Sequence, residues 1–213
     1  MKTAERILMV SLDLLNQHGE PNVSSIDIAN ELDISPGNLY YHFKGKEIII
    51  TALFDMYKKR MSKILLAHDD KNLTIEDFFY YLLLILETSH LFLFLYRNPT
   101  EISEKYPHVA QGLSRVLSAK QKVFKNCIQS FADQGLLIKD AKQQQQMLEL
   151  IGLVCTQAPN YHLLLGEEIN DGSYIYGSLA TILFALAPYI NIEREVYEEL
   201  YRSILSQQIK TDT

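Results

Sequence analysis

Apolar residues recur at three- and four-residue spacing along most of the chain, the period of an α-helix with one buried face. The first such stretch covers residues 3–18, where Ile7, Val10 and Leu14 share a stripe. Gly19 and Pro21 follow and end the pattern. Leu, Ile, Ala, Glu, Gln and Lys dominate the chain, whereas its nine glycines and six prolines are too few for a fold with many tight turns. The pattern predicts an all-α protein.

Two short helices are predicted directly after the first one. Ser24 is a suitable N-cap, with Asp27 three residues later to complete a capping box, and the helix should end at Leu32. Ser35 caps the next helix, Pro36 takes its first position, and Gly45 ends it. Two short helices joined by a turn of three or four residues define a helix-turn-helix.

The remainder reads as longer helices. The pattern predicts helices over residues 46–67, 74–97, 107–134, 141–166, 173–189 and 193–208, with a plausible boundary at 69–72. We therefore expect an all-α chain with a three-helix helix-turn-helix DNA-binding domain over residues 1–48. A larger helical effector-binding and dimerisation domain covers 49–213, and the helix at 46–67 links the two.

Composition fits a soluble globular protein, with 47% hydrophobic and 22% charged residues. Cys127 and Cys155 lie in apolar helical stretches and the N-terminus does not read as a secretory signal, so we expect a reducing, cytoplasmic location. The longest apolar stretch, 78–96, is interrupted at 87–90, and no membrane partner is expected.

The charge balance constrains any contact with DNA. The net charge is −6, and the first 60 residues carry seven Lys or Arg against eight Asp or Glu. Nucleic acid must therefore be bound through a local patch and not through a global field.

The third helix offers such a patch. Leu39 and Phe43 are four residues apart and share a face, which should point at the first two helices. Tyr40, Tyr41 and His42 then fan around the exposed side, where phenol and imidazole groups can contact phosphates and base edges. The alternative is that these are chance surface aromatics.

Neighbouring residues extend this patch. Lys44 and Lys46, with the free N–H groups at the start of the fourth helix, form a candidate phosphate site. Gly37 permits close approach of the backbone to DNA, and Asn38 can donate or accept at a base edge. Capping alone accounts for Ser24 and Ser25.

The segments Arg6–Gly19, Ile28–Ala29 and Ile34–Glu47 resemble the DNA-binding domain of the TetR family of regulators, over residues 4–50. The chain departs from the family at Ser11, often alanine there, and at Asp33, usually glycine. The resemblance implies that the following residues contact operator DNA: Ser25, Pro36, Gly37, Asn38, Tyr40, Tyr41, His42 and Lys46. It also implies dimerisation through the last long helices and a C-terminal effector pocket. Most members repress and some activate.

Two C-terminal stretches, around 147–155 and 174–187, are apolar nearly all round. A helix without a polar face is buried on both sides, which favours a partner subunit, with burial inside one chain as the alternative. The residues predicted at a homodimer interface are Met147, Ile151, Gly177, Ala180, Phe184 and Ala187.

Large apolar side chains also gather where an effector pocket is expected, between the fourth, fifth and seventh helices. The predicted lining is Tyr57, Phe78, Leu82, Leu86, His90, Phe94, Phe124, Phe131 and Cys155, and ordinary core packing is the alternative. The expected effector is a small apolar molecule. Glu87 and His90 form a single E-x-x-H pair without a second copy, so no metal and no cofactor are predicted.

An enzyme is the main competing class. The chain has no glycine-rich phosphate loop, no G-x-S-x-G motif and no cluster at ligand spacing, so we predict a non-enzyme. The prediction is a sequence-specific DNA-binding regulator, a repressor released from a palindromic operator by a small apolar effector. An activator, a regulator without ligand response, and a helical enzyme or scaffold are the alternatives.

Overall fold

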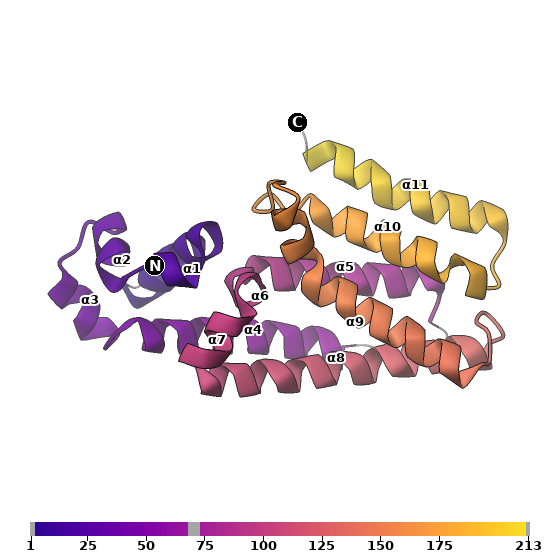
Figure 1. The fold of residues 1–213 in the computed structure, drawn as a ribbon, viewed down its shortest axis with the longest axis horizontal. Coiled ribbons are helices and arrows are strands. Elements are labelled where there is room, and N and C mark those ends of the chain that lie inside the picture. Colours follow the sequence, from indigo (N-terminus) through magenta and orange to yellow (C-terminus); the bar gives the residue numbers. More distant parts are fainter. Residues whose placement is uncertain (1–2, 68–72, 212–213) are drawn as a thin grey trace. The chain divides into compact units, whose positions relative to one another are not determined.

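The computed structural model describes residues 3–67 and 73–211, and within these ranges the protein is all-α, as predicted (Figure 1). The helices are α1 (Thr3–His18), η1 (Glu20–Asn22), α2 (Ser25–Glu31), α3 (Pro36–His42), α4 (Lys46–Leu66), α5 (Ile75–Leu91), α6 (Phe94–Arg97), α7 (Pro99–Lys105), α8 (Pro107–Asp133), α9 (Ala141–Leu164), α10 (Tyr174–Leu186), η2 (Ala187–Tyr189) and α11 (Arg194–Thr211). The boundary predicted at 69–72 lies outside the described residues.

The structure corrects the predicted helix over 74–97, which is divided into α5 and α6. At the break, the side chain of Asn16 in α1 hydrogen-bonds to two backbone groups. Its Nδ2 donates to the Leu91 carbonyl at 3.0 Å, and its Oδ1 accepts from the Phe94 N–H at 3.0 Å. Residues 92–96 are all buried, so the apolar pattern runs through the break without marking it. The short helix α7 was not predicted at all.

The chain forms two compact units, and their division falls within α4, α5 and α8. The first unit comprises Met1–Ser62 and Thr88–Val116. Its core includes Ile7, Leu15 and Ile28, which are completely buried. In this unit α2 packs against α1 and α3, and α1 also contacts α6.

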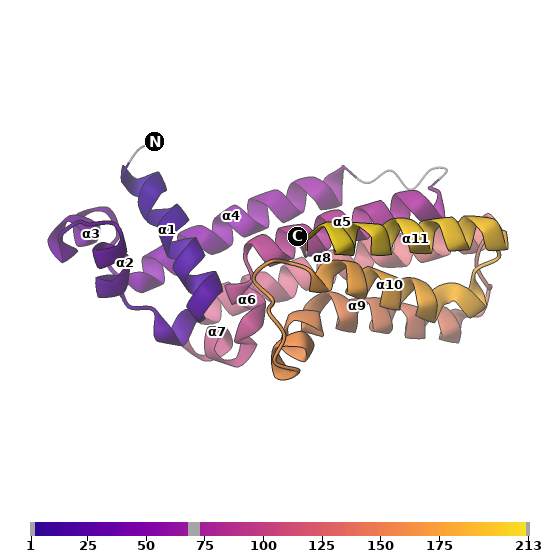
Figure 2. The same cartoon turned by 90° about the horizontal axis from the view of Figure 1, so that it is seen from above.

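The second unit comprises Lys63–Glu87 and Leu117–Thr213. Within it α10 lies between α9 and α11 (Figures 1 and 2). Its core contains Phe78, whose ring makes edge-to-face contacts with the rings of Phe124 and Phe131. The boundary between DNA-binding and effector domains at residue 48 stays a prediction.

No helix in the described part of the chain combines the length and hydropathy that crossing a membrane would require.

Candidate nucleic-acid interface and ligand-binding regions

The helix-turn-helix is built by the capping residues that the sequence predicts. The Ser24 hydroxyl accepts from the Asp27 N–H at 3.2 Å, and Asp27 Oδ2 accepts from the Ser24 N–H at 2.7 Å, completing the capping box. Ser35 Oγ accepts from the Asn38 N–H at 3.1 Å and so starts α3. Asp33, in the turn between the helices, has φ 54°, the left-handed conformation that glycine adopts more readily.

The third helix has one buried and one exposed side. Leu39 and Phe43 are 2% and 9% exposed, so they face the interior as predicted. Tyr40 and Tyr41 are 60% and 83% exposed, and the Tyr41 ring meets that of His42 edge-on at 5.2 Å between centroids. We call the exposed side chains of Tyr40, Tyr41 and His42 the aromatic arc. Further predicted contact residues are also exposed, namely Pro36, Gly37, Asn38 and Lys44.

Ser25 and Lys46 differ from this set because both are only half-buried. The Lys46 ammonium lies 2.5 Å from Glu20 Oε1 and also donates to the Glu20 carbonyl. The structure thus gives Lys46 a partner inside the protein, and any contact that it makes with phosphate stays a prediction.

Glu20 was missed in the sequence analysis. It is 1% exposed, follows α1, and holds three groups from elsewhere in the first unit. Besides Lys46, Glu20 Oε2 pairs with Lys105 Nζ at 3.2 Å, and Oε1 accepts from the Tyr106 hydroxyl at 2.6 Å. We call these four residues the Glu20 cluster. It connects the segment after α1 with the start of α4 and the end of α7.

The partners of Glu20 keep it ionised. Burial raises the pKa of its carboxyl, but hydrogen bonds from Lys46 and Tyr106 outweigh burial, so the pKa lies below its ordinary value. The pKa of Tyr106 is raised, first by burial and then by its hydrogen bond to the Glu20 carboxylate. Tyr106 therefore remains a neutral donor at neutral pH.

The residues predicted for the effector pocket are divided between the two units. Tyr57, His90 and Phe94 belong to the first, where the buried Tyr57 hydroxyl is hydrogen-bonded to that of Tyr96 at 2.5 Å. Phe78, Leu82, Leu86, Phe124, Phe131 and Cys155 belong to the second. All except His90, which is half-buried, are buried.

Two of these residues, Phe124 and Cys155, line a cavity of about 390 Å³ between α8 and α9. The same cavity is lined by Lys120, which is only 2% exposed and which the sequence analysis missed. Burial raises the pKa of the Cys155 thiol to about 11, so this cysteine is protonated and unreactive at neutral pH.

The predicted dimer residues also separate into two groups. Met147, Ile151 and Ala180 are 4%, 0% and 7% exposed, so they pack within the chain, the alternative considered for these helices. Gly177 and Ala187 are half-buried, and Phe184 is 72% exposed. Other large apolar side chains are exposed on α9, among them Leu153, Tyr161 and Leu164. Their exposure was not predicted, because helical spacing does not show which apolar side lacks a neighbour.

Within residues 3–67 and 73–211, no three or more His, Cys, Asp or Glu side chains are placed to hold a metal ion.

Comparison with known proteins agrees with this geometry. Residues 7–53 match a family model described as bacterial regulatory proteins of the tetR family, and residues 56–196 match TetR, a bacterial transcriptional repressor. The second match covers more than half of the chain. The chain therefore belongs to the TetR family of DNA-binding transcriptional regulators, and the sequence resemblance is confirmed. This family is not enzymatic.

Individual relatives support the assignment. A TetR-family regulator from Marinobacter aquaeolei VT8 is 26% identical, with 99% of each chain covered and a TM-score of 0.80. A helix-turn-helix-type regulator from Xanthobacter autotrophicus is 34% identical over 64 residues, so the match spans 30% of this chain and 32% of that relative. SmeT, solved in complex with triclosan, shares the fold at 12% identity, with coverage of 89% and 92% and a TM-score of 0.57.

Proposed function

We propose that this protein is a repressor that binds a palindromic operator as a homodimer and is released from it by a small apolar effector. The observation that carries the proposal is the aromatic arc. It lies on the second helix of a helix-turn-helix, the helix that enters the major groove in such motifs. Tyr41, at 83% exposure, contributes little to the fold and has its hydroxyl available for DNA.

The contacts around the arc have distinct expected roles. Tyr40, Tyr41, His42 and Asn38 are placed for base edges and nearby phosphates, while Gly37 and Pro36 leave room for the duplex. Lys44 is exposed and suited to a phosphate. Ser25 and Lys46 are proposed to contact the DNA backbone, but to contribute less to binding than the residues of α3. Ser25 is half-buried, and Lys46 is paired with Glu20.

A homodimer is supported by the exposed apolar residues of α9 and α10. Leu164 is 88% exposed and Phe184 is 72% exposed, on two helices that pack against each other. Large apolar side chains that a single chain leaves exposed are often buried in a protein interface. Dimerisation is also characteristic of the family. We propose that Phe184, Gly177 and Ala187 contact the partner, together with the exposed residues of α9.

Binding of a small-molecule effector is supported by a protein that shares this fold. A protein of the same fold, SmeT, holds triclosan, so the architecture can accept a small molecule. Release requires only that the effector prefer the form that does not bind DNA, with a coupling of about 1–3 kcal/mol, or roughly 5–150-fold in operator affinity. Of the residues predicted to line the pocket, Phe124 and Cys155 lie at the cavity between α8 and α9 of the second unit, and we propose this cavity as the effector site.

Selection from a random duplex pool with the full chain tests the proposal. We expect an inverted repeat with half-site centres about 10 base pairs, or a multiple of that, apart, and two chains bound to each duplex. Selection of no common sequence would contradict the proposal, as would one chain bound to an asymmetric site.

A further inference from the structure

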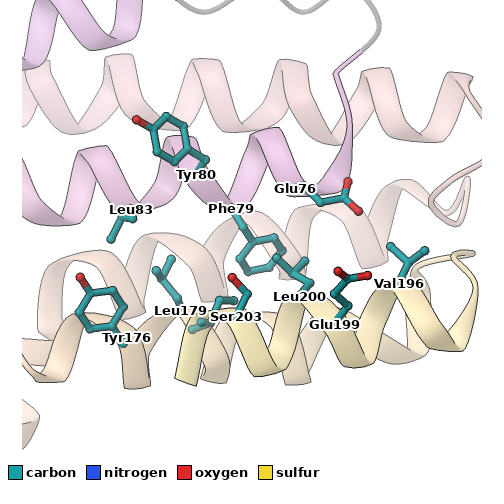
Figure 3. A pocket seen from close by; sticks show the side chains of 11 residues that line it. Glu76, Phe79, Tyr80, Leu83, Tyr176, Leu179, Val196, Glu199, Leu200 and Ser203 are labelled. Carbon is teal, nitrogen blue, oxygen red and sulfur yellow. The ribbon is translucent and has the colours of Figure 1, made fainter. Parts of the chain in front are cut away.

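A groove in the second unit is not used by any of the sites above. It is lined by side chains of α5, α10 and α11 (Figure 3). Its volume is about 690 Å³. Pockets that hold small organic molecules have volumes of roughly 300–1,000 Å³. The groove is therefore large enough for a ligand.

The middle of the groove is apolar. Phe79 and Leu179 are 3% and 2% exposed and form its floor, and Leu83 and Leu200 lie beside them. Tyr80 and Tyr176 lie toward one end, and Glu76 and Glu199 lie toward the other (Figure 3). A ligand that fills the groove must therefore have an apolar body.

The acidic end sets the charge of the ligand. Glu76 comes from the first turn of α5 and Glu199 from α11, and their carboxylates point toward the same end of the groove (Figure 3). Within the described parts of the chain, neither carboxylate has an ion-pair partner, and the groove lining includes no Lys, Arg or His. Two carboxylates at one end repel each other and any anion, whereas one cation would be attracted to both.

We propose that this groove binds an organic cation with an apolar body, its ammonium group between Glu76 and Glu199 and its body along Phe79, Leu179 and Leu200. The ligand class thus combines a positive head with a chain or ring system that displaces water from the floor. The inference is independent of the proposed effector, because the groove shares no residue with the cavity lined by Phe124 and Cys155.

Calorimetry with the full chain tests the ligand class. The probes are decyltrimethylammonium, decanol and decanoate, which have the same alkyl chain with a positive, neutral or negative head. We expect saturable binding of one cation per chain, with decanol weaker by about fivefold or more and decanoate weakest, because each exposed ion pair contributes up to about 1 kcal/mol.

Variants locate the site. Glu76→Gln and Glu199→Gln should each weaken decyltrimethylammonium up to about fivefold and leave decanol unchanged. Glu195→Gln is the matched control, an exposed glutamate of α11 outside the groove lining, and should bind as the wild type does. Ser203→Phe places a ring in the groove and should abolish binding, provided that circular dichroism shows native helix content.

Equal affinity for decanol and the cation would overturn the inference. So would unchanged cation binding in the two groove variants, or an equal loss in the control. Operator binding is measured on the same preparations to separate the two proposals. Loss of cation binding with operator binding intact overturns only the groove, and cation binding without operator binding overturns only the proposed function.

Discussion

Removal of the Glu20 carboxylate should destabilise the protein because Glu20 is buried and contacts three donors. In Glu20→Ala the ammonium of Lys46 keeps only the Glu20 carbonyl, and breaking a buried ion pair costs about 3–5 kcal/mol. Since the Lys46 side chain is 19% exposed, we expect the lower end of that range. Glu20→Gln retains an acceptor for Tyr106 and should cost about 1.5–3 kcal/mol, the value of a hydrogen bond to a charged group.

The pH dependence separates the charge from simple packing. The pKa of Glu20 is lowered in the folded protein from its ordinary value of 4.5, so its ionisation stabilises the fold above that pH. This stabilisation is lost as the pH falls through the folded pKa. The difference between the wild type and Glu20→Gln should therefore be full at pH 7 and shrink below pH 4.5.

Urea unfolding followed by circular dichroism measures these differences at one fixed protein concentration, because dimer stability depends on concentration. Glu104→Gln is the matched control, since Glu104 is an exposed residue of α7 and should leave the unfolding free energy unchanged. A Glu20→Gln variant within about 0.5 kcal/mol of the wild type at pH 7 would refute the reasoning, since that is the range of ordinary surface substitutions.

Three further substitutions have expected outcomes. Asp33→Gly should raise the unfolding free energy by about 0.5–1 kcal/mol in the same urea assay, because φ is 54° there, and a loss of stability would contradict the assigned turn. Gly112→Ala should lower the thermal midpoint, since the added Cβ would lie 2.3 Å from the Phe54 ring, at a cost of about 1–3 kcal/mol; Gly152→Ala, with open space around it, should not. Phe184→Glu should give monomers by light scattering, whereas Leu66→Glu, at a leucine that is even more exposed, should remain dimeric. A dimeric Phe184→Glu would remove α10 from the interface.

The local structure of the helix-turn-helix could be predicted from the sequence because its signals are local. Ser24 with Asp27, and Ser35 with Asn38, set the helix starts through contacts three residues apart, and Pro36 takes the first position of α3. The spacing of Leu39 and Phe43 likewise identified the buried side of α3 and hence its exposed arc.

Features that depend on distant partners were missed. The break between α5 and α6 depends on Asn16, which is 75 residues before Leu91. Glu20 is buried because Lys46 and Tyr106 reach it from 26 and 86 residues away, and no periodicity marks such a residue. The groove with Glu76 and Glu199 forms only when α5 and α11 lie together. Helical spacing identified Met147 and Ile151 as buried but could not tell whether the neighbour was the same chain or a partner.

The most direct test of the central claim is the specificity ratio of the aromatic arc, the affinity for a selected operator divided by that for a scrambled duplex. We expect Tyr41→Ala and His42→Ala each to weaken operator binding by about 1–3 kcal/mol and to leave scrambled DNA nearly unchanged, so that the ratio falls about 5–150-fold. Lys44→Ala should instead weaken both duplexes alike and reduce the salt slope by about one unit. Circular dichroism and light scattering confirm that fold and dimer are retained. If both arc variants keep the wild-type ratio with the fold intact, α3 does not read the operator and the account is wrong.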